Sequence, residues 1–255
     1  MFKLIKYVMV DILRSKVIIA YTLFLLVISL SIFNLEDNAA KGLLSLLNII
    51  LIIVPLVSLI FSTIYMYNVN EFIELLVSQP LKRTQILLSL YAGICFSLLT
   101  AFAIGAGIPV ILLEGSATAY MMTITGLALT AIFVSLAILG SVITRDKAKG
   151  IGVAILMWLY FSLLYDGLLL LVMFQFSDYP LEKIMIVFCS LNPVDLARVQ
   201  ILLKMDISAL MGYTGAIFND FFGTYFGIIY STVIMSAWII FPLVIAFRKF
   251  RTKNM

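Results

Sequence analysis

The stretch NEFIELLVSQPLKR, residues 70–83, is a short charged island between two long apolar runs. Its apolar residues recur at helical spacing along one face, and polar residues occupy the other. Because Pro80 cannot continue a helix, the pattern predicts an amphipathic helix of about two to three turns. A helix this short is marginal by itself, so we expect it to pack against a partner. The apolar face comprises Val69, Phe72, Ile73 and Leu76, and the opposite face comprises Glu71, Glu74 and Ser78.

The composition places the chain in a membrane. It has 255 residues, of which 64% are hydrophobic and 12% charged, and its mean hydropathy is +1.17. Soluble domains carry far more charge, and about 20 apolar residues in a helix span roughly 30 Å of hydrocarbon. We therefore predict a single all-α integral membrane domain over residues 1–255 with six transmembrane helices. The expected spans are 17–33, 43–67, 86–113, 120–143, 151–176 and 226–247.

Lysine and arginine are distributed unevenly between the two sides of these spans. Six spans place both termini, the charged island and the loop 144–150 on one side, which then holds 13 of the 17 basic residues. Because basic loops face the cytoplasm, we predict that this side, with both termini, is cytoplasmic. The net charge of +4 therefore reports topology, and no nucleic-acid partner is expected. The basic residues on the other side are Lys41, Lys183, Arg198 and Lys204.

Residues 1–16 are expected to form an amphipathic segment on the cytoplasmic lipid surface. Apolar and charged residues recur there at helical spacing. A plain basic flank that anchors the first span explains the same residues equally well. The apolar set is Phe2, Ile5, Met9, Ile12 and Leu13, and the charged set is Lys3, Lys6, Asp11 and Arg14.

The chain lacks the residues on which many enzymes and metal sites depend. It contains no histidine, which removes the commonest general base and the histidine-based zinc sites. It contains no P-loop sequence, so it is not expected to hydrolyse ATP by itself. Cys95 and Cys189 fall at different predicted depths, so no disulfide is expected. We predict no catalytic residue and no metal or cofactor bound by this chain.

The third predicted span contains overlapping pairs of small residues followed by a proline. The small residues are Ala101, Ala103, Gly105 and Gly107. Small residues four apart let two helices approach closely, so we expect a tight helix contact here. Pro109 removes a backbone hydrogen bond, so we also expect a kink.

Asp166, in the fifth predicted span, carries a separate functional hypothesis. Carboxylates in a membrane are costly and usually face the bundle interior or a water-filled cavity. About 16 residues of helix, or roughly 24 Å of rise, place Asp166 near the outer interface. One interpretation is a role in gating or substrate contact. The other is an interfacial carboxylate bonded to tyrosine or water.

Residues 177–223 form the one sizeable extramembrane segment that the sequence predicts. Asn192, Pro193 and Asp195 together predict a helix start, with asparagine as the N-cap and an acidic residue in the first turn. The helix should run to about Lys204. The stretch that follows, to about residue 218, is apolar but broken by glycines, which favours a surface helix or a re-entrant segment. We expect the whole segment to bind an extracytoplasmic partner.

The chain resembles the ABC-2 type permeases of ABC transporters over its full length. In that family a cytoplasmic stretch after the second span carries acidic residues, a Leu-Leu pair, a proline and then a basic residue. The resemblance implies that region 68–85 is the coupling helix that docks into a separate ATPase subunit. An amphipathic hairpin that lies only on membrane lipid is the alternative, and its acidic face argues against it. The ATPase-coupling residues would be Glu71, Phe72, Glu74, Leu75, Leu76, Gln79, Pro80, Lys82 and Arg83.

A narrower resemblance concerns the outer segment. Stretches 191–198 and 208–216 are similar to the permeases of copper-processing transporters that mature nitrous-oxide reductase. This resemblance implies a permease homodimer, two ATPase subunits that bind ATP and Mg²⁺, and a periplasmic accessory protein. Copper would be held by partner proteins outside the membrane. Residues expected to bind the accessory protein are Asn192, Pro193, Asp195, Arg198, Met211 and Tyr213.

Other functions are compatible with the same pattern. Within the ABC-2 family, export of a lipid, drug or peptide, or support of gliding motility, is the alternative to copper-centre assembly. An intramembrane enzyme is disfavoured because catalytic residues are missing. A standalone secondary transporter should carry a buried ion-coupling site, for which Asp166 alone is thin support.

Overall fold

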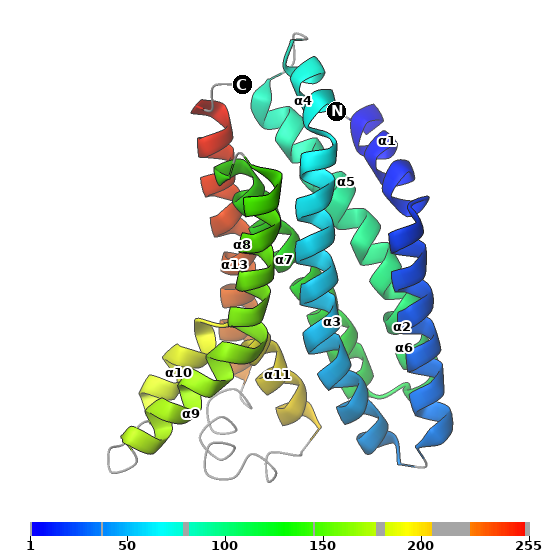
Figure 1. The fold of residues 1–255 in the computed structure, drawn as a ribbon. Coiled ribbons are helices and arrows are strands. Elements are labelled where there is room, and N and C mark those ends of the chain that lie inside the picture. Colours follow the sequence, from blue (N-terminus) through cyan, green and yellow to red (C-terminus); the bar gives the residue numbers. More distant parts are fainter. Residues whose placement is uncertain are drawn as a thin grey trace.

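The protein is a bundle of long helices that runs from one charged end to the other (Figure 1). The computed structural model describes residues 2–36, 38–78, 82–144, 146–176, 182–205 and 225–252, and every regular element in these ranges is a helix. Six of them are long and apolar enough to cross a membrane, and they confirm the predicted multi-pass all-α fold. They are Lys16–Leu35, Ala40–Asn68, Arg83–Glu114, Ala117–Ile143, Lys147–Gln175 and Phe226–Thr252.

Two of the spans consist of three helical pieces. In span three, α5 (Arg83–Phe102) and α6 (Ile108–Glu114) flank the π-helical turn η1 (Ala103–Gly107), and in span five α8 (Lys147–Leu159) and α9 (Tyr165–Gln175) flank η2 (Tyr160–Leu164). The other elements are α1 (Phe2–Leu13), α2 (Lys16–Leu35), α3 (Ala39–Asn68), α4 (Asn70–Val77), α7 (Ala117–Ile143), α10 (Glu182–Ser190), α11 (Pro193–Lys204) and α13 (Tyr225–Thr252).

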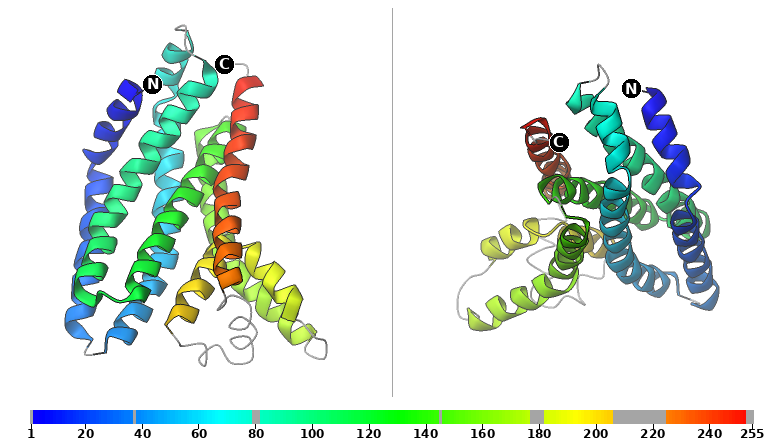
Figure 2. Two further views of the ribbon diagram at one scale, coloured as in Figure 1. Left: turned by 180° about the vertical axis from the view of Figure 1, so that it is seen from behind. Right: turned by 45° about the horizontal axis from the view of Figure 1, so that its top comes forward.

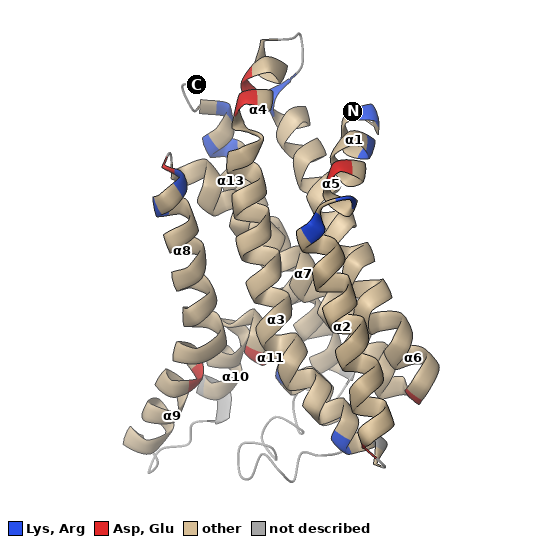
Figure 3. Ribbon diagram, turned by 45° about the vertical axis from the view of Figure 1, so that its right-hand side comes forward, with Lys and Arg blue, Asp and Glu red and all other residues tan. Residues whose placement is uncertain are grey.

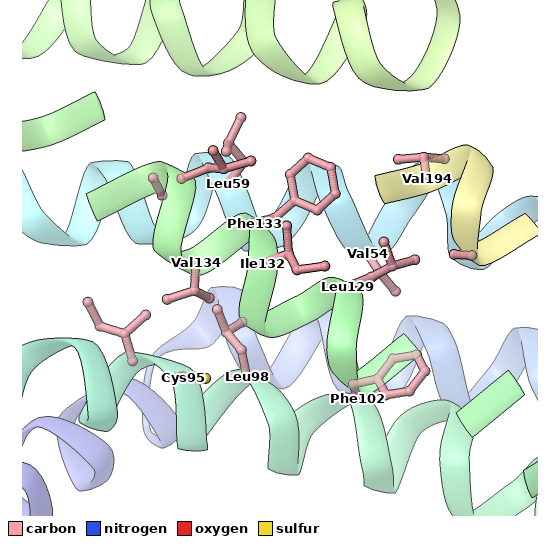
Figure 4. Close-up of a cluster of buried hydrophobic side chains, with 14 of the residues drawn as sticks. Val54, Leu59, Cys95, Leu98, Phe102, Leu129, Ile132, Phe133, Val134 and Val194 are labelled. Atoms are coloured by element: carbon pink, nitrogen blue, oxygen red, sulfur yellow. The ribbon is translucent and has the colours of Figure 1, made fainter. Parts of the chain in front are cut away.

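Helix α7 occupies the centre of the bundle. It packs along α3 and α13 and also touches α5 and α11, so its side chains are enclosed on several sides. Figure 4 shows Ile132 and Phe133 of α7 between the aliphatic side chains of α3 and those of α5. The fully buried side chains in this view include Val54, Leu59, Leu98, Phe102, Leu129, Ile132, Phe133 and Val134.

The π-helical turn η1 lies where the sequence predicts a kink and a close helix contact. Gly105 approaches α2 so closely that a Cβ atom there would lie 2.9 Å from the carbonyl oxygen of Thr22, which confirms the predicted contact. Pro109 has no N–H to donate to the carbonyl of Gly105, four residues earlier. Ser29 Oγ donates to that carbonyl over 3.2 Å. The neighbouring helix α2 therefore supplies a hydrogen bond where the proline cannot.

Helix α1 packs on the protein itself. Val8 and Ile12 are buried, and Val8 lies directly over Gly93 of α5. Phe2 and Leu13, which we assigned to the same apolar face, are 88% and 37% exposed. The prediction of an amphipathic helix holds, but its buried stripe faces α5 and is centred on Val8.

Charged residues gather toward the two ends of the bundle (Figure 3). Helices α1 and α4, the start of α8 and the end of α13 lie at one end, as the views from the front and back agree (Figures 1 and 2). We call this the terminal end. Helices α9, α10 and α11 lie at the other end, which we call the distal end, and α9 and α10 turn outward from the bundle there (Figure 2).

Candidate functional site

Helix α4 is the amphipathic rod that the charged island predicts. It runs from Asn70 to Val77, and Ile73 and Leu76 are its buried residues. Glu71 and Glu74 are exposed on the opposite face, as the pattern predicts. Gln79 and Pro80, which we also assigned to this region, lie outside the described residues.

Helix α4 is joined closely to the bundle. Val69 is the single residue between the end of α3 and the start of α4, so the two helices have no flexible linker. The Phe72 ring packs against Tyr7 of α1 with 5.7 Å between ring centroids. Helix α4 is therefore joined directly to α3, which is 30 residues long and packs on the central helix α7.

The surface of α4 that faces away from the bundle combines charge with one large apolar side chain. Leu75 is 66% exposed, next to the buried Leu76. Lys82 is exposed beyond the end of the helix. Arg83 is half-buried and its Nη1 donates to the carbonyl oxygen of Arg251 over 3.4 Å, which connects this region to the end of α13. The exposed set that can meet a partner is Glu71, Glu74, Leu75 and Lys82.

A second site, at the distal end, is built around Arg198. Its Nη1 lies 2.6 Å from Oδ2 of Asp166 and 3.5 Å from Oδ1 of Asp195. Asp166 follows η2 in span five, whereas Asp195 and Arg198 lie on α11. One guanidinium therefore bridges two carboxylates from different elements. We call these three residues the charged centre.

Asn192 holds the start of α11 against span five. Its Oδ1 accepts a hydrogen bond from the N–H of Val194 over 2.9 Å, which is the predicted N-cap. Its Nδ2 donates to the carbonyl of Phe161 over 2.9 Å and to Oδ2 of Asp195 over 3.0 Å. Phe161 belongs to the π-helical turn η2, where carbonyls lose their regular α-helical partners. The asparagine thus caps one helix and bonds the irregular part of another.

The environment of Asp195 disfavours its ionised form. Burial raises the pKa of its carboxyl group, and the neighbouring Asp166 carboxylate raises it further, whereas Arg198 and the hydrogen bond from Asn192 lower it. Burial dominates, so the pKa lies well above the ordinary value for aspartate. The proton on Asp195 leaves the charged centre close to neutral, with Asp166 as the partner of Arg198.

A pocket of about 370 Å³ opens beside the charged centre. The three charged residues form its polar part. Aliphatic and sulfur-containing side chains from α9, α10 and α11 form the rest: Leu169, Leu170, Met173, Met185, Cys189, Val199 and Leu202. Burial raises the pKa of the Cys189 thiol, so it stays protonated. The arrangement can hold a molecule that has both a charged and an apolar part.

The residues that we assigned to gating and to partner binding at the distal end make contacts in the structure that the sequence does not predict. Asp166 and Arg198, which we assigned to gating and to partner binding, meet in one ion pair. Asn192, Pro193 and Asp195 are buried, so the chain's own helices account for their pattern. Met211 and Tyr213 lie outside the described residues, and partner binding stays a prediction. Among the described residues, no group of three or more His, Cys, Asp or Glu side chains could hold a metal ion.

The sequence matches no protein-family model, and no curated protein matches it either. The geometry of the two sites is therefore the basis for the function proposed below.

Proposed function

We propose that this chain is the permease subunit of an ABC-2 type transporter, in which a separate ATPase subunit drives conformational change. The observation that carries the proposal is α4. It follows the second span, is joined to α3 by one residue and exposes Glu71, Glu74 and Leu75 at its free surface. A lipid-facing helix would expose basic residues, because anionic lipid repels carboxylates. A protein cleft with basic residues is the better partner for this surface.

In the proposed mechanism α4 acts as a lever. Closure of two ATPase subunits on ATP moves the two α4 helices of a permease homodimer, and each α4 moves its α3. Because α3 packs along α7, the movement reaches the centre of the bundle as a rigid-body rotation. The chemistry of ATP and Mg²⁺ takes place on the partner, and this chain supplies no catalytic residue.

The basic residues of the terminal end support an orientation for this assembly. Lys147 and Lys149 lie in the first turn of α8, Lys249 lies near the end of α13, and Lys82 directly precedes α5. Figure 3 shows lysine and arginine residues gathered at the terminal end. By the positive-inside rule, α4 and both termini face the cytoplasm of a bacterial inner membrane. The ATPase would meet α4 there, and the distal end would face the periplasm.

In its specific form, we propose that the permease serves copper-centre assembly of nitrous-oxide reductase through a periplasmic accessory protein. The support is the similarity of stretches 191–198 and 208–216 to permeases of that system. Copper is then the cargo of partner proteins. Export of a lipid, drug or peptide, or gliding motility, is the alternative function of the same lever.

Charge reversal on α4 tests the permease proposal. The variant Glu71→Lys with Glu74→Lys should lose co-purification with the ATPase subunit, or keep binding but lose transport-linked ATP hydrolysis. Glu36→Lys is the matched control. Glu36 is an exposed glutamate that directly follows α2, at the end of the bundle opposite to α4. Full ATPase binding and activity in the double variant would refute the lever.

Deletion of the gene tests the copper form separately. A deletion strain should still translate nitrous-oxide reductase, but the enzyme should lack its copper centres. Metal analysis of the purified reductase measures this directly. A fully metallated reductase in the deletion strain would leave the permease proposal standing and remove its copper form.

A further inference from the structure

The pocket at the charged centre lies at the depth of lipid headgroups. Asp166 follows Lys147, the first residue of span five, by about 19 residues, which is about 28 Å of helical rise. The hydrocarbon core of a bilayer is roughly 30 Å thick. With Lys147 at one membrane surface, Asp166 therefore lies at the boundary of the opposite leaflet.

The elements around the pocket expose apolar side chains at the same level. Helices α9 and α10 turn outward from the bundle (Figure 1). Leu171 and Phe174 of α9 are 67% and 80% exposed, and Val187 of α10 is 57% exposed. Apolar side chains in this position are covered by the acyl part of the interface. The pocket therefore lies beside apolar surfaces that a lipid leaflet would cover.

The charged centre has unused hydrogen-bonding capacity on both of its exposed members. Arg198 makes both of its ion pairs through Nη1, and the described residues offer no partner to its Nη2 or Nε. Asp166 bonds Arg198 through Oδ2 and also interacts with the neighbouring Asp195 carboxyl group, and its carboxylate has further acceptor sites. The two side chains are 30% and 34% exposed. Asp195 is buried, and its two carboxyl oxygens already lie within hydrogen-bond distance of Asn192 Nδ2 and Arg198 Nη1.

We propose that this pocket binds a phospholipid with an ethanolamine headgroup. The phosphate accepts hydrogen bonds from Nη2 and Nε of Arg198, a fork that suits two phosphate oxygens. The primary ammonium donates to the carboxylate of Asp166. One acyl chain lies along Leu169, Met173 and Leu202, which line the apolar part of the pocket. This site does not depend on whether α4 binds an ATPase.

Charge complementarity selects this headgroup among the common phospholipids. Phosphatidylglycerol carries no cation for Asp166 and adds an anion next to two carboxyl groups. Phosphatidylcholine carries a cation, but its quaternary nitrogen has no N–H to donate. Among these three lipids, only phosphatidylethanolamine has both a phosphate for Arg198 and an N–H cation for Asp166.

Lipid-binding measurements on the purified full-length chain test the proposal. Delipidated protein is titrated with phosphatidylethanolamine, phosphatidylcholine or phosphatidylglycerol of identical acyl chains, and bound lipid is counted by native mass spectrometry. A charge-assisted hydrogen bond contributes about tenfold in affinity, so the ethanolamine lipid should bind about tenfold more tightly than either competitor. Equal affinities for the three lipids would overturn the proposal.

Two variants separate the two halves of the headgroup. Asp166→Asn should remove the preference for ethanolamine over choline, and Arg198→Gln should weaken the binding of every phospholipid about tenfold. Arg14→Gln is the matched control, because Arg14 borders a different cavity, at the terminal end, with Val17, Leu56 and Ile60. A preference retained in Asp166→Asn, or lost equally in Arg14→Gln, would contradict the assignment.

A photocrosslinking measurement covers the case in which a variant fails to fold. Wild-type protein in membranes is exposed to a phosphatidylethanolamine that carries a photoreactive group on its acyl chain near the headgroup. Labelled peptides should come from α9 and α11. A Leu170→Cys variant that instead forms disulfide-linked dimers and excludes the lipid would assign the pocket to a second copy of the chain.

Discussion

Arg198 on α11 bonds Asp166 in span five over 2.6 Å, and this pair ties the distal helix to the bundle. Both residues stand out in the sequence as charges in an apolar region, but they are 32 residues apart and no local pattern connects them. The π-helical turn η2 and the Asn192 cap bring the two elements together. The ion pair therefore depends on two local features, the π-helical turn η2 in span five and the Asn192 cap of α11.

Removal of Arg198 should destabilise the protein more than removal of Asp166. Asp166→Asn leaves Arg198 its bond to Asp195, and a partly exposed pair contributes about 1 kcal/mol. Arg198→Gln leaves two neighbouring carboxyl groups without a cation, so we expect a loss of about 2 kcal/mol, between the values for exposed and buried pairs. Thermal unfolding of detergent-solubilised protein, followed by intrinsic fluorescence, shows which substitution destabilises the protein more. Equal effects of the two substitutions would show that Asp195 gains nothing from Arg198.

Gly126 should tolerate no side chain, whereas Gly140 on the same helix should. A Cβ atom at Gly126 would overlap the ring of Phe102, which is fully buried. Gly126→Ala should therefore lower stability by about 1–3 kcal/mol through overpacking. A Cβ atom at Gly140 would meet nothing within 4 Å, so Gly140→Ala should gain up to about 1 kcal/mol from helix propensity. The two melting temperatures should move in opposite directions.

The transmembrane fold could be predicted from the sequence because it depends on the apolar composition of each span and on the helical spacing of apolar residues. Six apolar runs determine six spans, and Asn192 with Pro193 determines where α11 begins. The burial of α11 was not predictable in the same way. Its neighbours α3 and α7 are distant in sequence, and nine of its twelve residues are buried by them and by other elements. Short helices are predicted in the outer segment before the last span, but the bounds of α10 were not predicted, because it is a short apolar stretch beside a longer segment of similar composition.

The adjacent residues Leu75 and Leu76 should separate partner binding from stability. Leu76 is 8% exposed and packs into the bundle, so Leu76→Ala should cost about 2–5 kcal/mol of stability. Leu75 is 66% exposed, so Leu75→Ala should leave the melting temperature unchanged and weaken binding of the proposed ATPase subunit. Co-purification and thermal unfolding of each variant test the pair. Full ATPase binding by Leu75→Ala would place the contact elsewhere on α4.

The orientation of the protein can be read from cysteine labelling. The chain has two cysteines, Cys95 and Cys189, and both are buried. Glu74→Cys and Glu36→Cys therefore each introduce an exposed thiol, at the terminal and distal ends. In intact cells a membrane-impermeant maleimide should label Glu36→Cys only, and in inverted vesicles it should label Glu74→Cys only. The reverse pattern would place the termini outside the cytoplasm.

The stability of the protein should fall as the pH rises, because of Asp195. Its pKa in the folded state is raised by burial, whereas in the unfolded chain it takes the ordinary value of about 4. Between these two values the folded state holds a proton that the unfolded state has released, so the unfolded state gains relative stability with each unit of pH. The stabilisation by protonated Asp195 is complete below about pH 4 and is lost as the pH rises through the raised pKa.

The variant Asp195→Asn mimics the protonated form, so its melting temperature should vary less with pH than that of the wild type. A wild type whose melting temperature rises with pH over this window would mean that Arg198, and not burial, controls the charge of Asp195.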